Sequence, residues 1–201
     1  MEAELGIPEK SRRSVTESQK LSKDTSTQLF AALASARNGE LTQAQKLADD
    51  LDRQFPQHFL IQNFSLPTIR AAVKLNQNDP AAAVRLLEPV TRYDLAFLDH
   101  GFDDVYPAYL RGLAYLRLKN GRLAAPEFQK VLDHRAIGQG AIIGALARLQ
   151  LARAQAMMGD RFAARKTYED FLTSWKDADP DIPLYKDAKA EYARLDKSLA
   201  N

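Results

Sequence analysis

A pattern of small and apolar residues recurs four times along this chain of 201 residues. In each copy a small residue is followed by alanine 12 positions later and by apolar residues 16 and 19 positions later. The copies start at Ala32, Ala71, Gly112 and Ala152, so they lie 39, 41 and 40 residues apart. A period of this length indicates a repeat architecture, in which each unit buries its apolar face against its neighbours.

A turn signal divides each copy into two stretches with the apolar period of a helix. The signals are Gly39, Asn78 to Pro80, Gly121 and Gly159. No segment alternates apolar and polar residues, so no sheet is expected. The sequence therefore predicts an all-α fold of four helical hairpins. Because Gly121 lies two residues later in its copy than the other turn glycines, we expect a longer first helix in the third hairpin.

The ends of the chain and two longer connections stand apart from the repeats. Residues 1–24 are polar and charged, which predicts a mobile tail, whereas residues 25–201 form the repeat domain. The stretches 91–104 and 134–142 are expected to be loops between hairpins. An amphipathic helix from about Pro183 would cap the open end of the stack.

The spacing of small and aromatic residues resembles the tetratricopeptide repeat. That family has a small residue at position eight, an aromatic at eleven, alanine at twenty and an aromatic or leucine at twenty-four. The third copy matches at all four places, and the others match in part. The matching residues, expected to pack the repeats together, are Ala32, Ala44, Ala71, Ala83, Gly112, Tyr115, Ala124, Phe128, Ala152, Ala164 and Tyr168.

This resemblance implies a right-handed superhelix of about four hairpins. On it, the small residues let two helices approach closely, and Phe128 and Tyr168 fill the gap to the next hairpin. The period near 40 exceeds the 34 residues of that family and also suits HEAT-type helical repeats, which stay open as an alternative.

Longer runs resemble the C-terminal repeat regions of bacterial serine/threonine protein kinases. They are "NFSLPTIRAAVKL", "YPAYLRGLAYL", "EFQKVLDHRAI", "LARLQLARAQAMMGD" and "FLTSWKDADPDIPLYKDAKAEYARL". Similar regions follow winged-helix DNA-binding domains in some bacterial regulators. The resemblance implies a relative, or a piece, of a larger signalling protein whose catalytic domain lies outside this chain.

The composition excludes several classes of function. A net charge of +2, from 28 basic and 26 acidic residues, gives no general attraction for nucleic acid or an anionic membrane. The absence of cysteine excludes disulfides and zinc–thiolate sites. No apolar run is long enough to span a membrane, and no signal peptide is evident, so a cytoplasmic protein is expected.

No constellation of catalytic or metal-binding residues is visible. A glycine-rich phosphate loop and the kinase motifs are lacking, so we expect no enzyme activity and no cofactor. The three histidines, His58, His100 and His134, are expected at loops or helix ends. The acidic run "DADPD" at 177–181 lacks the glycine and glutamate of a calcium loop, and the stretch 138–144 is glycine-rich without a phosphate-binding pattern.

The remaining candidate is the inner surface that a superhelix of hairpins would form from its first helices. On the family's register, Arg37, Asn76, Tyr106, Tyr109, Arg117 and Arg153 point into this groove. Tyrosine and arginine dominate binding hot spots, and arginine suits a carboxylate or phosphate. The alternative is that the tyrosines pack the core and the arginines are solvated helix ends.

The repeats predict a protein- or peptide-binding module, and the resemblance to kinase repeat regions implies that it is the regulatory or scaffolding C-terminal part of a bacterial signalling protein. A self-association scaffold, a stand-alone adaptor and a small-molecule sensor are the alternatives. The first predicts dimers in solution, and the last predicts thermal stabilisation by a small ligand.

Overall fold

The computed structural model describes residues 2–96, 104–134 and 141–200, and this part of the chain is helical without a strand. The all-α prediction is therefore confirmed over the described ranges. The α-helices are α1 (Pro8–Leu21), α2 (Thr25–Arg37), α3 (Leu41–Gln54), α4 (Leu66–Asn76), α5 (Pro80–Leu87), α6 (Tyr106–Arg117), α7 (Gly121–Asp133), α8 (Ala141–Met157), α9 (Arg161–Ser174) and α10 (Pro183–Ala200). A π-helical turn η1 (Ile61–Ser65) leads into α4, and a 3-10 turn η2 (Pro89–Tyr93) follows α5.

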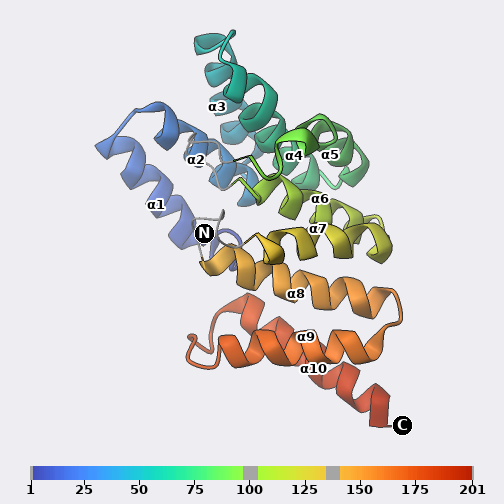
Figure 1. Cartoon of the computed structure of the whole chain (residues 1–201). Coiled ribbons are helices and arrows are strands. Elements are labelled where there is room, and N and C mark those ends of the chain that lie inside the picture. The colour runs from blue at the N-terminus through green and yellow to red at the C-terminus, as the bar shows by residue number, and fades with distance from the viewer. Residues whose placement is uncertain (1, 97–103, 135–140, 201) are drawn as a thin grey trace.

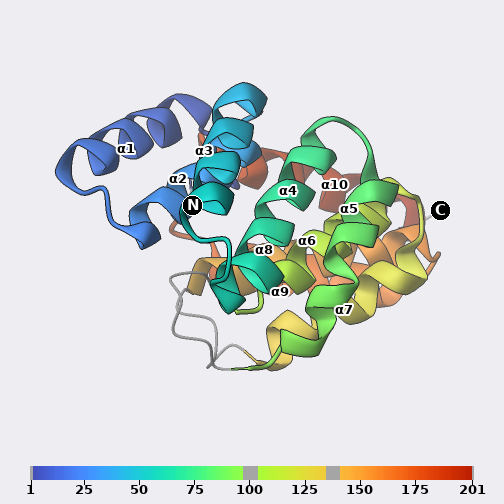
Figure 2. The same cartoon turned by 90° about the horizontal axis from the view of Figure 1, so that it is seen from above.

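Four helical hairpins form the body of the molecule, as the repeats predict. They are α2–α3, α4–α5, α6–α7 and α8–α9, and each is joined by a tight turn. The first helix of each later hairpin contacts both helices of the hairpin before it. The hairpins consequently follow one another in chain order from one end of the molecule to the other (Figure 1). Figure 2 shows the same stack from above.

The four turns share one backbone conformation. Gly39, Asn78, Lys119 and Gly159 each lie seven residues after the small residue of their copy, and their φ angles are 81°, 58°, 58° and 83°. The amide of each bonds to the carbonyl three residues earlier, for example Gly39 N to Ala36 O and Lys119 N to Leu116 O. A left-handed residue after the last helical turn satisfies carbonyls that would otherwise lack donors. The turn is therefore part of the repeat.

The expected longer first helix in the third hairpin is wrong. Helix α6 ends at Arg117, and Lys119 adopts the left-handed conformation in place of a glycine. Gly121 instead begins α7 against the end of α8, where a Cβ atom would lie 2.7 Å from the carbonyl oxygen of Ala154. The glycine is shifted along the sequence because contact with the next hairpin requires it there.

The small residues of the repeat lie in the core. All the residues expected to pack the repeats are buried except Tyr115, which is partly buried. A Cβ on Gly112 would lie 2.6 Å from the ring of Phe128, so α6 and α7 approach closely only because glycine is there. Phe128 thus packs within its own hairpin, where it also contacts the ring of Tyr109.

The buried residues form two clusters. The larger runs through the first three hairpins and onto one side of α8. The smaller lies between α8, α9 and α10 and includes Leu149, Phe171, Tyr185 and Ala188. Helix α10 begins at Pro183 as predicted, and it covers the apolar side of the last hairpin.

The N-terminal residues, for which the sequence predicts a mobile polar tail, form a turn and a helix. Residues 2–6 form a turn, and α1 packs against α2. Polar anchors replace apolar ones: Ser11 is the one buried residue of α1, and its hydroxyl accepts a hydrogen bond from Asn38. Arg12 also pairs with Glu40. A search for apolar periodicity misses such a segment because its contacts are mostly hydrogen bonds and ion pairs.

The expected loops are described in part. Residues 97–103 and 135–140, which include His100, lie outside the described residues. Residues 89–93 form η2, and Ala141 already belongs to α8.

Candidate binding site

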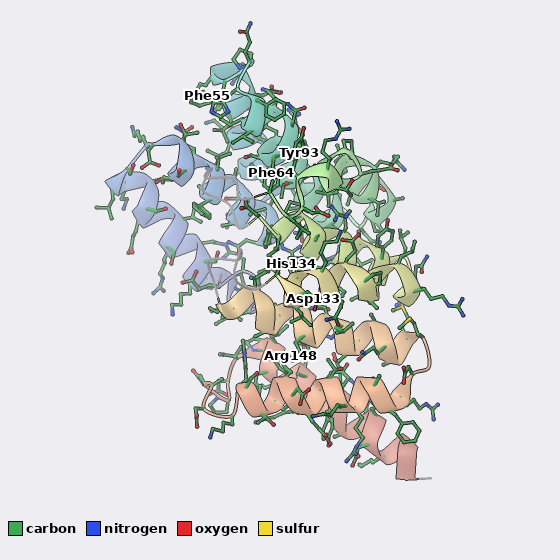
Figure 3. The ribbon with its side chains drawn as sticks, in the orientation of Figure 1. Phe55, Phe64, Tyr93, Asp133, His134 and Arg148 are labelled. Atoms are coloured by element: carbon green, nitrogen blue, oxygen red, sulfur yellow. The ribbon has the colours of Figure 1, made fainter. Side chains whose placement is uncertain are left out.

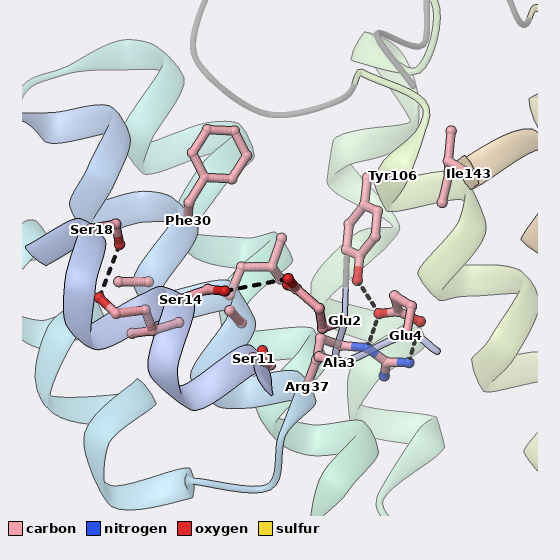
Figure 4. A pocket seen from close by; sticks show the side chains of 14 residues that line it. Glu2, Ala3, Glu4, Ser11, Ser14, Ser18, Phe30, Arg37, Tyr106 and Ile143 are labelled. Carbon is pink, nitrogen blue, oxygen red and sulfur yellow. Dashed lines mark hydrogen bonds and ion pairs between the residues drawn. The ribbon is translucent and has the colours of Figure 1, made fainter. Parts of the chain in front are cut away.

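Three of the predicted groove residues converge on one carboxylate. The Glu4 side chain lies between α2 and α6 and is 6% exposed (Figure 4). Arg37 donates to both of its oxygens, with Nη2 2.9 Å from Oε2. The hydroxyl of Tyr106 donates to Oε1 at 2.5 Å, and that of Tyr109 to Oε2 at 3.3 Å. Two hairpins far apart in the sequence thus bind an acidic group from the N-terminal turn.

The charges in this cluster stabilise one another. Burial by itself disfavours the Glu4 carboxylate, but the charge and hydrogen bonds of Arg37 and the Tyr106 hydroxyl outweigh it, so the pKa of Glu4 lies below its ordinary value. Burial and the nearby Glu4 charge raise the pKa of Tyr106 and of Tyr109, so both remain hydroxyl donors at neutral pH. The two-pronged contact of Arg37 is the geometry in which guanidinium binds a carboxylate most strongly.

A compact turn carries Glu4 to this position. The amides of Leu5 and Ile7 bond to the carbonyl of Glu2, and Gly6 has a φ of +77°. Gly6 lies against the start of α10, since a Cβ there would be 3.2 Å from Pro183. Leu5 packs on the larger core cluster. The N-terminal turn therefore rests on α2, α6 and α10 together.

Two further groove candidates link successive hairpins. Asn76 donates to the carbonyl of Ala36, and Arg117 donates to the carbonyl of Leu75. In both, the donor lies five residues after the small residue of its copy, and the acceptor lies four residues after that of the preceding copy. Each of these carbonyls also accepts the amide of the turn residue that follows it, Gly39 or Asn78, so the side chain is an additional donor. Arg37 has the same repeat position in the first hairpin, where no hairpin precedes it, and it binds Glu4 instead.

The last candidate, Arg153, belongs to a second carboxylate cluster. Its Nε and Nη2 lie 2.8 Å and 2.9 Å from the oxygens of Glu191 on α10. The hydroxyl of Tyr168 donates to the same carboxylate at 2.9 Å. Arg153 thereby fastens α10 to the last hairpin.

Arg117 is the cation of this surface that keeps a free side. In the described part of the chain its one hydrogen bond is to a carbonyl, and no carboxylate binds it. Burial and the positive charge of Arg37 lower the pKa of Arg117. Glu4 pairs with Arg37, whereas Arg117 bonds to a carbonyl, so the positive charge of Arg117 is not paired with a carboxylate of the described residues.

Tyr109 departs from the expectation that it lines an open surface. It is 1% exposed, and its ring lies 5.8 Å from that of Tyr106 and 5.9 Å from that of Phe128. Only its hydroxyl reaches the site. Tyr109 is thus a core residue whose hydroxyl bonds to the buried Glu4 carboxylate, in line with the alternative that the tyrosines pack the core.

Sequence reasoning missed both acidic partners and one buried cluster. Glu4 lies in a polar segment with no helical period, and Glu191 is one of many charges on α10. The buried cluster joins Arg111 and Lys130 to Asp94 and Glu127, with Arg111 Nη2 2.7 Å from Glu127 and Lys130 Nζ 2.7 Å from Asp94. Two positive and two negative groups balance there, so this cluster fastens the residues after η2 to α6 and α7.

The other polar motifs lie apart from this surface. His134 is at the end of α7, where Nδ1 lies 2.9 Å from the carbonyl of Lys130, and the adjacent Asp133 accepts from Gln129 (Figure 3). His58 Nδ1 accepts a hydrogen bond from the amide of Ile61 at the start of η1. Asp179 accepts the amide of Asp181 in the turn before α10. Both described histidines are thus at helix ends, as predicted.

Two negative findings concern the described residues. They contain no group of three histidine, aspartate or glutamate side chains that could hold a metal ion. None of their helices combines the length and apolar character needed to cross a bilayer.

Comparison with known proteins adds no relative. A scan against protein-family models, a search of curated proteins and a search of solved structures each found no match to this chain. The resemblance to tetratricopeptide repeats and to kinase repeat regions remains a prediction from the sequence.

Proposed function

We propose that this chain is a protein-binding repeat module that takes an acidic segment of a partner on its inner face. Here the inner face means the surface formed by α2, α4, α6 and α8 around Arg37, Tyr106 and Arg117. One observation carries the proposal: side chains from two hairpins are already arranged to bind a single carboxylate. A preformed site binds a ligand without a cost for ordering its own side chains.

The charge of the inner face favours a ligand with more than one negative charge. Glu4 neutralises one of the two neighbouring arginines, and Arg117 has no acidic partner in the described ranges. A second carboxylate or a phosphate on the partner segment would pair with Arg117. Arginine is suited to both because its guanidinium offers several donors in one plane.

In this proposal the hairpins form a right-handed superhelix of the tetratricopeptide type. The regular turns and the repeated contact from Asn76 and Arg117 to the preceding hairpin support it, because both follow the period of the sequence. We also propose that the chain serves as the regulatory or scaffolding part of a bacterial signalling protein of the serine/threonine kinase type. It contributes binding and no catalysis of its own.

Peptide binding to charge-reversed variants tests this function. An array of eight-residue peptides with a central glutamate, each paired with its glutamine version, is probed with the full chain. We expect the glutamate peptides to be retained, and Arg117→Glu to weaken their binding at least about 10-fold through like-charge repulsion. Arg85→Glu is the matched control, because Arg85 is exposed on α5 in another hairpin helix. Equal binding by both variants would contradict the proposal.

A self-association scaffold is the second candidate, and one observation favours it. Large apolar side chains are exposed where the turns of the last two hairpins meet, beside Gly121. They are Leu118, Leu123, Met157, Met158 and Phe162, the last 81% exposed. Apolar groups gathered in this way are typical of protein contacts. Light scattering of the wild type and of Phe162→Asp tests it: a dimer lost in the variant would support the scaffold, and a monomer throughout would exclude it.

A further inference from the structure

The carboxylate on the inner face belongs to the chain itself. Glu4 is the group that Arg37, Tyr106 and Tyr109 bind, and it arrives on a turn that precedes the repeats. We propose that residues 2–21 are a tethered occupant of the binding site, which a partner's acidic segment must displace. This inference rests on the proposed function and adds the way in which the site is regulated.

The segment is held by contacts that a competitor can replace. Its anchors are the Glu4 carboxylate, the Ser11–Asn38 hydrogen bond and the Arg12–Glu40 ion pair. Ser11 is the one buried residue of α1, so few apolar groups would become exposed if the helix left. Charged and hydrogen-bonded contacts of this kind are exchangeable because water or a similar ligand can satisfy both partners.

The space under α1 is incompletely filled. A cavity of about 300 Å³ lies between α1 and α2 (Figure 4). Val15 and Ser18 line it from the side of α1, and Ala31 and Ala34 from the side of α2. The pocket is partly open to solvent, and each contact that α1 and α2 do not make across it weakens the attachment of α1. Helix α1 is thus attached at its edges and leaves its centre open.

The hairpins do not depend on this segment for their cores. Residues that fill the four hairpins come from α2 to α9, and the segment adds Leu5, which is only partly buried, to the edge of the larger cluster. Local opening of one weakly packed element is common in folded proteins and leaves the rest intact. The segment can therefore leave while the hairpins persist.

Tethering sets the strength of the competition. A ligand on the same chain acts at an effective concentration near the millimolar range. A partner binds only the fraction of molecules in which the site is open, so its apparent affinity falls by that fraction. If the site is open in a tenth of the molecules, an external peptide binds about 10-fold more weakly than to a chain whose segment is released.

A labelled copy of the occupant tests the proposal. The probe is a fluorescent peptide of residues 2–8, EAELGIP, with blocked ends, and its binding to the full chain is measured by anisotropy. We expect Glu4→Gln to bind it about 10-fold more tightly than the wild type, because the tethered ligand has lost its charge. Glu17→Gln, an exposed change on the same segment, should match the wild type. The peptide EAQLGIP should not bind.

Trypsin cleavage after Arg13 reports release of the segment independently. It should be faster in Glu4→Gln, and in the wild type once the peptide is added. Arg12→Gln supplies a second variant, since it removes the pair with Glu40 without touching the site, and should bind the peptide with an intermediate affinity. Circular dichroism verifies that every variant keeps its helices.

The outcomes separate the two proposals. Equal peptide affinity and equal cleavage in the wild type, Glu4→Gln and Arg12→Gln would overturn the tethered occupant. Faster cleavage of Glu4→Gln without peptide binding to any variant would show an open site that takes no ligand, and would overturn the proposed function.

Discussion

Glu4 and Glu191 occupy similar settings at opposite ends of the chain and are held there in different ways. Each carboxylate accepts from an arginine and a tyrosine of the hairpins. Glu191 lies within α10, a helix that also buries Tyr185 and Ala188 against the last hairpin. Glu4 lies on a short turn, and α1 behind it buries only Ser11.

The difference shows what a buried ion pair does in each place. Apolar burial supplies most of the free energy that holds a helix to its neighbour, whereas an ion pair chiefly fixes geometry. Helix α10 has both, so it is part of the folded body. The N-terminal segment has mainly the polar contacts, so it resembles a bound ligand. The predictions below test this distinction in order of decreasing effect.

The largest expected effect is on the stability of the hairpin core, against which both ends of the chain pack. Tyr109→Ala removes a fully buried ring that contacts Tyr106 and Phe128, and such truncations cost about 3–5 kcal/mol of unfolding free energy. Tyr106→Phe removes only the hydroxyl on Glu4 and should cost about 1 kcal/mol or less. Urea denaturation followed by circular dichroism measures both. Equal losses for the two variants would place Tyr109 outside the core.

Glu191→Gln should produce the next effect. It leaves Arg153 and Tyr168 without the carboxylate that binds them, and because the Arg153 and Glu191 side chains are each 25% exposed the cost should be about 1 kcal/mol. The control is Asp187→Asn, an exposed carboxylate on the same helix, which should change stability little. Thermal unfolding measures the shift. A stability unchanged by Glu191→Gln would mean that apolar contacts alone hold α10.

Glu4→Gln should change global stability less than Glu191→Gln does, although Glu4 is the more buried carboxylate. The reason is that the N-terminal segment can detach before the hairpins unfold, so its loss is not counted in the main transition. The two variants are compared by denaturant midpoint in parallel. A larger loss for Glu4→Gln would mean that the segment is an integral part of the fold.

The smallest effect is a dependence of segment attachment on pH. Glu4 faces Arg37 from α2 and the Tyr106 and Tyr109 hydroxyls from α6, with Arg153 of α8 acting on Tyr109, and its pKa is lowered when the segment is attached. The detached segment therefore binds a proton more readily. Attachment is at full strength above the ordinary glutamate pKa of about 4.3, and it is lost as the pH falls through the lowered value.

Because trypsin is inactive at this pH, release of the segment has to be detected by another method. Thr16→Cys provides a single site for a nitroxide label, because the chain has no other cysteine. In the protein that keeps Glu4, the label should gain mobility below about pH 4. With Glu4→Gln added, its mobility should be higher at neutral pH and less dependent on pH. The same titration in both proteins would assign the effect to other carboxylates.

The repeat was predictable from the sequence because its residues recur at the same positions in each copy. The small residues, the turn positions and the start of α10 follow from periods that packing imposes on every copy. Gly121 does not follow this spacing, because glycine is required there by close contact with Ala154 and Met158 and not by the turn. The spacing within one repeat does not predict which residue will contact the next hairpin.

The site was predictable only on one side. Arg37, Tyr106 and Tyr109 are candidates because of the register that the tetratricopeptide resemblance implies, but nothing in the spacing indicates that Glu4 meets them. A contact between residues 4 and 106 depends on how the chain folds back over three hairpins. Likewise nothing in the spacing shows that Asn76 and Arg117 each bond to a carbonyl of the preceding hairpin.

Native-state hydrogen exchange of the wild type tests most directly whether the two ends differ as proposed. The protection of amides in α1 (Pro8–Leu21) is compared with that in the part of α10 that carries Tyr185 to Glu191. We predict that amides of α1 exchange roughly 100-fold faster than those of α10. Exchange in α1 should occur by a local opening whose rate low denaturant does not change, whereas amides of α10 should exchange together with those of the hairpins. Equal protection, lost from both helices in one global transition, would contradict the account and make the N-terminal segment a fixed part of the fold.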